Sequence, residues 1–340
     1  MYILNKVAII FLTSLILISC SDTSAETVNN SDFFVGYKKI MVESKETGDE
    51  FPLTIVYPTN TKSKPVKFGP FQMNLSIGAR IANKKFPLVI ISHGSGGSNW
   101  GHRSIAFDLA KKGYIVGLPL HPRNNYRDNS DEGTNNNWLN RPKHIKSAID
   151  SILSNVEFFN NIEKNKIAVV GHSAGGYTAL ALAGGIGNSE HIINLCKEKP
   201  KINQNFCSLA KSNSTKPIEL KGLSDSRVKA IVLMAPVGLL FQSDDALKQV
   251  KIPVFLMRAE KDKELVEPYH SELIAKKIRK QLLSYQIIPN AGHFSFITPF
   301  PEVLKSKLGD VADDPEGFDR VAFHKQLGNS IATYLGKVLK

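Results

Sequence analysis

The chain has 340 residues, of which 42% are hydrophobic and 22% are charged, and this length fits one large domain that carries an insertion. The formal net charge is +12 at pH 7, but the basic residues are spread along the chain and accompany no nucleic-acid-binding motif. These features argue against a nucleic-acid partner and leave attraction to anionic lipid or other cell-envelope surfaces open.

Residues 1–19 have the pattern of an export signal. Lys6 precedes an apolar stretch, Val7–Ile18, whose length suits a signal sequence and is short for a membrane span. The stretch ends in Leu17-Ile18-Ser19-Cys20, which resembles the lipoprotein box of bacteria. In that box, cleavage precedes the cysteine and the thiol carries a diacylglycerol. The alternative is an ordinary secretory signal in which the cysteine has no role.

We therefore expect removal of residues 1–19, lipidation of Cys20, a polar tether at residues 20–34 and one domain at residues 35–340. Two or three acyl chains on a cysteine hold a protein firmly on a membrane, since each buried methylene contributes about 0.8 kcal/mol. The expected location is the bacterial cell envelope, facing the periplasm or in the outer membrane. The residue after the cysteine is Ser21 rather than Asp, and the resemblance to bacterial lipoproteins implies that this residue suits sorting to the outer membrane of an organism that has one.

The domain begins with two β-rich runs, Phe33–Ser44 and Phe51–Pro58, that predict a hairpin around a polar turn. Residues 59–84 are polar and predict a connecting loop. Beyond them, apolar runs that indicate buried strands alternate with helical patterns. Strands are expected at Phe86–Ser92, Tyr114–Leu120, Ile167–Val170, Lys229–Ala235, Pro253–Arg258 and Leu283–Ile288. Helices are expected at Ser104–Lys112, at Pro142–Asn155, from Ser173 to about Ala183, at Glu267–Lys280 and at Phe318–Val338.

This alternation predicts an α/β fold with a doubly wound, mostly parallel sheet, in which chemistry gathers at the carboxyl ends of the strands. Residues 184–227 depart from the pattern because they are rich in Asn, Ser and Lys, and we interpret them as a lid-like insertion. The insertion contains Cys196 and Cys207, with ten residues between them. In an exported protein this pair predicts a disulfide, and a pair of free buried thiols is the alternative.

The segment Gly171-His172-Ser173-Ala174-Gly175 follows a predicted strand and opens a predicted helix. Strand, Gly-x-Ser-x-Gly and helix, in that order, are the signature of the nucleophile elbow of serine hydrolases. Small residues two before and two after the serine let the turn close and expose the Ser173 hydroxyl at the edge of the sheet. A phosphate-binding loop or a plain turn is the alternative, and no Lys-Ser/Thr pair follows to support the former.

A serine nucleophile needs a base, and in this fold the order along the chain is serine, acid, histidine. His293 is the predicted base, because it directly follows the strand Leu283–Ile288. The other late histidines, His270 and His324, fall within predicted helices and are interpreted as surface or structural residues.

Asp262 is the predicted acid, because it follows the strand Pro253–Arg258 and precedes His293 by one helix and one strand. Its role is to accept the Nδ1 hydrogen of the imidazole, so that Nε2 faces the serine. Four other carboxylates remain open as alternatives, namely Glu260, Glu264, Asp244 and Asp245.

An oxyanion hole requires two backbone N–H donors. One is predicted to be the Ala174 amide at the start of the helix, and the other the Ser95 amide in the loop His93–Gly97, whose glycines allow close approach. We interpret His93 as a residue that ties this loop down, and His172 as one that packs beside the serine.

No pattern of metal ligands is apparent, so we expect no metal. His-x-x-x-His and closely paired cysteines, the usual spacings of zinc ligands, do not occur. His121 with Asp128 and Asp131 is the nearest arrangement, and a polar loop explains it.

With these motifs, the chain resembles the α/β-hydrolase superfamily, and within it the predicted dienelactone hydrolases and the platelet-activating-factor acetylhydrolase-like group. Further support comes from Val56-Tyr57-Pro58, Ile91-Ser92-His93-Gly94, Leu120-His121-Pro122 and Phe318-Asp319-Arg320. The resemblance covers roughly residues 35–338. It departs from true dienelactone hydrolases in having a serine rather than a cysteine nucleophile, and the segment 184–227 alters the pocket.

The resemblance implies a cofactor-free serine hydrolase that cleaves carboxylic esters, with a short acyl group, through an acyl-enzyme on Ser173. The expected substrate is a small-molecule or lipid ester. A serine peptidase or amidase on the same fold is one alternative, and a non-catalytic surface-binding lipoprotein is another. A peripheral lipase would need an apolar lid, which the polar segment 184–227 does not provide.

Overall fold

The computed structural model describes residues 33–199, 201, 206–207 and 216–340. The predicted signal sequence, Cys20 and most of the predicted tether lie outside the described residues. None of the helices in the described ranges is both long and apolar enough to cross a membrane.

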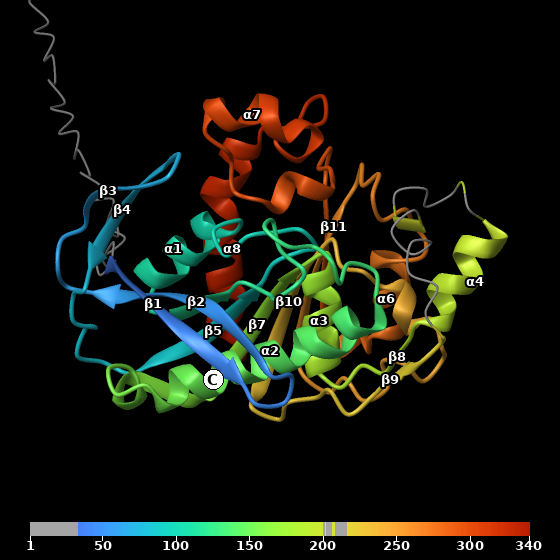
Figure 1. The fold of residues 1–340 in the computed structure, drawn as a ribbon, viewed down its shortest axis with the longest axis horizontal. Helices are drawn as coiled ribbons and strands as arrows, with labels where there is room; N and C mark the ends of the chain where they lie inside the picture. The colour runs from blue at the N-terminus through green and yellow to red at the C-terminus, as the bar shows by residue number, and fades with distance from the viewer. Residues whose placement is uncertain (1–32, 200, 202–205, 208–215) are drawn as a thin grey trace, which may run out of the picture. The chain divides into compact units, whose positions relative to one another are not determined.

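The elements alternate along the chain as the sequence predicts (Figure 1). The strands are β1 (Phe34–Ser44), β2 (Asp49–Thr59), β3 (Lys64–Phe68), β4 (Phe71–Ile77), β5 (Phe86–Ser92), β6 (Ile115–Pro119), β7 (Ile162–His172), β8 (Gly187–Asn188), β9 (Glu219–Leu220), β10 (Val228–Met234), β11 (Val254–Ala259) and β12 (Leu283–Ile288). The helices are α1 (Arg103–Lys111), α2 (Asn135–Ser154), α3 (Ala174–Leu182), α4 (Glu190–Glu198), α6 (Ser271–Lys277), α7 (Glu302–Leu308) and α8 (Arg320–Val338).

Within the described part of the chain, ten strands form one sheet in the order β12-β11-β10-β7-β5-β6-β2-β1-β4-β3. The strands from β12 to β6 are parallel to their neighbours, and β2 joins them antiparallel. The predicted hairpin is β1 paired with β2. This architecture is the α/β-hydrolase fold, so the predicted fold class is confirmed.

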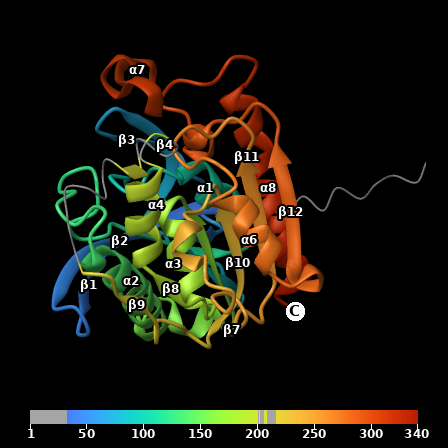
Figure 2. The ribbon, with the colours of Figure 1, turned by 90° about the vertical axis from the view of Figure 1, so that its right-hand side faces the viewer.

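Helices cover both faces of the sheet and bury two apolar cores (Figures 1 and 2). Helices α2, α3 and α6 pack on one face, through side chains such as Ile149, Tyr177 and Ile274. Helices α1 and α8 pack on the other face, through Leu109 and Ile331. The inner parallel strands β5, β6, β10 and β11 are buried along most of their length, which explains their apolar runs, whereas the edge strand β12 is exposed at four of its six residues.

The predicted loop at residues 59–84 is wrong, because β3 and β4 form a hairpin there that extends the sheet. In β4, Met73 and Leu75 are buried while the residues between and before them are exposed. A hairpin at the end of the sheet needs only one apolar face, so the sequence of β3 and β4 is too polar overall to be recognised as strands. Helix α7 also falls in a stretch for which no element was predicted.

Two predicted helices have different starts in the structure. The helix expected at Glu267–Lys280 is the shorter α6, because the carboxylate of Glu267 accepts hydrogen bonds from the amides of residues 270–272 and so caps the helix. Helix α2 begins before Pro142 rather than at it. Proline cannot donate to the Trp138 carbonyl, and the Tyr177 hydroxyl donates to that carbonyl instead, at 3.0 Å.

The described part of the predicted insertion contains β8, α4 and β9. Cys196, on α4, and Cys207 form a disulfide, which confirms the predicted pair. Ile192 and Leu195 of α4 are buried in the core that lies on the α3 face of the sheet. The interpretation of this segment as a lid stays a prediction.

Candidate active site

Ser173 stands in the sharp turn between β7 and α3, with φ 56° and ψ −119°. Residues other than glycine rarely adopt a positive φ, and the resulting backbone strain persists only where the surrounding structure enforces it. Added Cβ atoms would lie 2.0 Å from the Gly175 carbonyl oxygen at Gly171, and 2.0 Å from the Ser92 carbonyl oxygen at Gly175. The glycines therefore allow the elbow to pack against itself and against the end of β5.

His293 begins the short helix η4 (His293–Phe296), directly beyond β12, and its Nδ1 lies 2.8 Å from Asp262 Oδ2. Asp262 follows β11, and its other oxygen accepts the amides of Glu264 and Leu265 at 2.9 and 2.8 Å. Asp262 and His293 have only 7% and 6% of their side chains exposed. A carboxylate only accepts, so Nδ1 carries the hydrogen and Nε2 is left as a base.

The surroundings of His293 favour its protonated form. Burial alone would lower the pKa of its imidazole, but the charge of Asp262, its hydrogen bond and the charge of Glu264 together raise that pKa above 6.5. A raised pKa makes a stronger base at neutral pH, which is what removal of a serine proton requires.

The alternative residues make other contacts. Glu260 accepts the Asn290 amide, whereas Asp244 and Asp245 form surface ion pairs with lysines. His324 is bonded to the Ser104 hydroxyl and the Ser295 carbonyl. His270 is fully buried and lies just before α6 rather than in it, with burial lowering its pKa to about 3.

Ser173 and His293 line the same cavity, which has a volume of about 740 Å³. Within the described ranges, no hydrogen bond joins the two side chains. Such serine–histidine contacts are often long without substrate and tighten in the substrate complex. Ser173 and His293 therefore both face the same cavity, as the order of the motifs along the chain predicts.

The predicted oxyanion donors also line this cavity. The Ser173 carbonyl accepts from the Val237 amide at 3.0 Å, so the Ala174 N–H of the same trans peptide points to the opposite side. The Gly94 carbonyl accepts from Gly97 N–H at 3.1 Å and from His93 Nδ1 at 2.7 Å, and so the Ser95 N–H likewise points away from them. His93 is buried and ties the loop down, as interpreted from the sequence.

Most of the cavity wall is apolar and comes from segments far apart in the chain. The tip of the β3–β4 hairpin, the loop after β5, the predicted insertion and the segment around α7 each contribute to it. The large apolar lining residues are Phe68, Phe71, Trp100, Trp138, Ile192, Phe206, Val237, Leu265, Phe294, Ile297, Phe300, Leu304, Leu308 and Val311. The contributions of the hairpin tip and α7 were missed in the sequence, because nothing local to them indicates that they meet.

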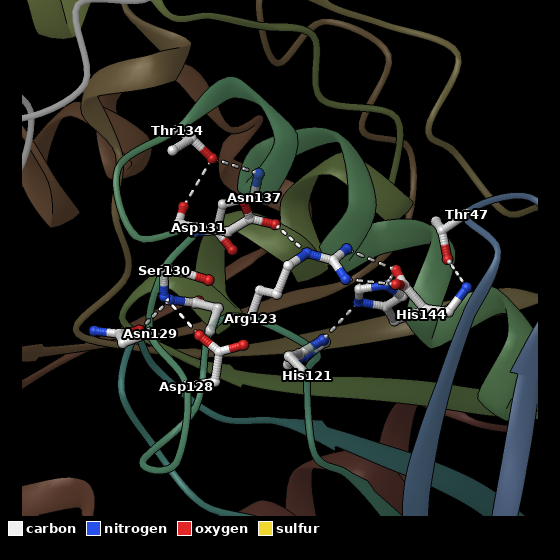
Figure 3. Close-up of polar contacts among 12 residues, drawn as sticks. Thr47, His121, Arg123, Asp128, Asn129, Ser130, Asp131, Thr134, Asn137 and His144 are labelled. Carbon is white, nitrogen blue, oxygen red and sulfur yellow. Dashed lines mark hydrogen bonds and ion pairs between the residues drawn. The ribbon is translucent and has the colours of Figure 1, made fainter.

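Charged groups of the polar loop after β6 form ion pairs within the loop and with the β1–β2 hairpin (Figure 3). Arg123 pairs with Asp49, on the β1–β2 hairpin, at 2.7 Å and with Asp131 at 2.9 Å. His121 instead bonds the Ser92 hydroxyl at 2.9 Å and approaches His144 at 3.4 Å. Asp131 and His121 therefore have separate partners, and the loop ties the hairpin to the end of β5.

Comparisons with known proteins agree with this fold. The model of the dienelactone hydrolase family matches residues 77–193, which include the elbow but neither Asp262 nor His293. Among solved structures, a ferulic acid esterase from Streptomyces cinnamoneus aligns with a TM-score of 0.60 and 17% identity, over 93% of this chain and 92% of that chain. A dienelactone hydrolase from Anabaena variabilis aligns with a TM-score of 0.48 and 17% identity, over 89% and 98%.

A search of the curated proteins gave no significant match. The chain has the α/β-hydrolase fold, and its residues 77–193 are similar to the dienelactone hydrolase family. This similarity supports a hydrolase of the esterase type.

Proposed function

We propose that this protein hydrolyses carboxylic esters through an acyl-enzyme on Ser173. The observation that carries the proposal is the 2.8 Å contact between Asp262 and His293, which orients the imidazole in the cavity that also holds the strained serine. In the first step, His293 Nε2 accepts the proton of the Ser173 hydroxyl as its oxygen attacks the ester carbonyl.

The negative charge of the tetrahedral intermediate is stabilised by the Ala174 and Ser95 amides. His293 then gives its proton to the leaving alcohol, which departs as the acyl-enzyme forms. Water attacks the acyl group in the second half of the reaction, with His293 again accepting a proton and returning it to Ser173.

The substrate we propose has a short acyl group and a larger apolar alcohol. The cavity of about 740 Å³ and its aromatic wall support a bulky apolar group. Rates for a series of nitrophenyl esters of increasing acyl length, and for acetate esters of increasing alcohol size, test the two parts separately. A rate that rises with acyl length would overturn the short-acyl part alone.

Labelling with a fluorophosphonate tests the chemistry. The wild-type protein is expected to take up the label and to hydrolyse nitrophenyl esters, whereas Ser173→Ala should do neither while remaining folded. Faster cleavage of aminoacyl anilides than of esters would favour the amidase alternative. Absence of labelling in folded wild-type protein would favour a binding module without catalysis.

We also propose that Cys20 anchors the protein to a membrane of the cell envelope. The apolar cavity supports this location, since it suits esters that partition into lipid. Metabolic labelling with a palmitate analogue should modify the wild type and not Cys20→Ala. Recovery of unlabelled, fully secreted wild-type protein would contradict the anchor and leave the esterase proposal unaffected.

A further inference from the structure

Arg141, on α2, is a charged side chain that is only 1% exposed. Its guanidinium makes hydrogen bonds to four different groups. The acceptors are the His93 carbonyl, the Ser92 hydroxyl at 3.3 Å, the Thr178 hydroxyl at 3.2 Å and the Asn124 side-chain oxygen. Four of the five N–H groups of an arginine are thereby used.

One side of this guanidinium holds the loop after β5. The His93 carbonyl points at Arg141, so the Gly94 N–H of the same peptide faces the other way. The next peptide is fixed as well, because the Gly94 carbonyl is held by His93 Nδ1 and by the Gly97 amide. Two successive peptide planes, which end at the Ser95 N–H, therefore have one orientation.

The other side of the guanidinium contacts α3, the helix that follows Ser173. Thr178, on α3, accepts from Arg141 Nε and donates to the Ala174 carbonyl at 2.9 Å. The first turn of α3, which begins with the Ala174 amide, is thus connected through one hydroxyl to the guanidinium. Arg141 bridges the two segments that carry the predicted oxyanion donors.

Among the described residues, no carboxylate pairs with Arg141. Removal of an unpaired cation from water costs several kcal/mol, a cost that neutral donors to the same acceptors would avoid. Burial lowers the pKa of Arg141 to about 9, so the group remains charged at neutral pH. A fixed positive charge behind both donors favours the negative charge that develops on the substrate oxygen.

We propose that Arg141 is a positioning residue that sets the geometry of the oxyanion hole, by holding the Ser95 loop and the Ala174 turn together. The inference rests on the proposed esterase function, since it assigns Arg141 a part in that same site. Arg141 acts through the two backbone amides and does not itself touch the substrate.

The test compares Arg141→Met, Arg141→Lys and a control, Arg227→Met, which removes the surface ion pairs with Asp150 and Asp225. In Arg141→Met we expect kcat for a nitrophenyl ester to fall about 100-fold, as for loss of one oxyanion donor, while KM changes little. Affinity for a boronic acid, which mimics the tetrahedral intermediate, should fall in parallel with kcat. Arg141→Lys keeps the charge with fewer hydrogen bonds and should lie between Arg141→Met and the wild type.

A purely structural role predicts a lower melting temperature with kcat and boronate affinity per folded molecule unchanged, and that result would overturn the inference. If Arg141→Met does not fold, two other measurements distinguish a positioning role from a purely structural one. These are kcat of Arg141→Lys and rescue of Arg141→Ala by guanidinium ion. Rescue should raise kcat of Arg141→Ala and leave Arg227→Met unaffected. A wild-type protein that takes no fluorophosphonate would instead refute the esterase proposal itself, so the two failures are distinguishable.

Discussion

His172 Nε2 lies 2.9 Å from the main-chain carbonyl oxygen of His293, so the residue before Ser173 holds the backbone of its proposed base. A carbonyl only accepts, and Nε2 of His172 therefore donates. Burial and the nearby His293 and His102 keep the pKa of His172 well below its ordinary value, so this imidazole stays neutral.

This contact predicts that His172 matters without taking part in proton transfer. In His172→Leu, the His293 carbonyl loses its donor and the imidazole of His293 is free to shift, and a displacement of about 1 Å can cost about 100-fold in rate. We therefore expect kcat of His172→Leu to fall by up to about 100-fold. His172→Gln retains an amide donor and should recover part of the loss, whereas equal activities of Leu and Gln variants would refute the role.

The pH dependence of the reaction should follow His293. Only the neutral imidazole accepts the serine proton, and the pKa of His293 is raised above 6.5. The value of kcat/KM should therefore be constant at high pH and decline as pH falls through a pKa above 6.5. A pH–rate profile with a nitrophenyl ester measures this pKa, and a midpoint below 6.5 would contradict the prediction.

Replacement of Asp262 by Asn should shift that profile as well as lower it. The variant removes the charge and the hydrogen bond that raise the pKa of His293, so the acid limb should move to lower pH. An amide at this position also favours the wrong tautomer, which in a comparable triad lowers kcat by about 10⁴-fold. Glu260→Gln serves as the control, because Glu260 contacts the Asn290 amide instead.

Replacement by alanine should destabilise the protein at Gly175, in the elbow, and not at Gly336, on α8. In Gly175→Ala the new Cβ would lie 2.0 Å from the Ser92 carbonyl oxygen, so we expect destabilisation of at least about 1–3 kcal/mol and loss of fluorophosphonate labelling. In Gly336→Ala, on α8, the nearest atom is 3.7 Å away, and the variant should be as stable as the wild type or more so. Thermal unfolding of both variants checks the prediction.

Reduction of the Cys196–Cys207 disulfide should affect substrate binding more than catalysis. The bond closes a loop of 11 positions, so its removal should cost less than about 3 kcal/mol of stability. Ile192 and Phe206 line the cavity beside these cysteines. In a Cys196→Ser, Cys207→Ser double variant, KM for a bulky ester should rise while kcat stays near the wild-type value. A fall in kcat without a rise in KM would contradict the role of this segment as part of the cavity wall.

The sequence alone was sufficient for the parts of this protein that are encoded locally. Inner parallel strands such as β5 and β6 are buried on both faces and therefore appear as continuous apolar runs, and the elbow needs glycines at fixed offsets from Ser173. Because parallel strands bring their carboxyl ends to one edge, the positions of Asp262 and His293 after neighbouring strands predict their contact, and they predict that His293 reaches the cavity that Ser173 lines.

Only the tertiary structure decided what surrounds them. The hairpin tip at residues 68–71 and helix α7 are distant in sequence, and they meet at the cavity through long-range packing that leaves no periodic signal in either segment. Arg141 looks like an ordinary helical cation in the sequence, yet it is buried between the loop after β5 and α3. Contacts of this kind depend on how helices dock on the sheet, which is settled by the sum of many weak, non-local interactions and not by any short stretch of the chain.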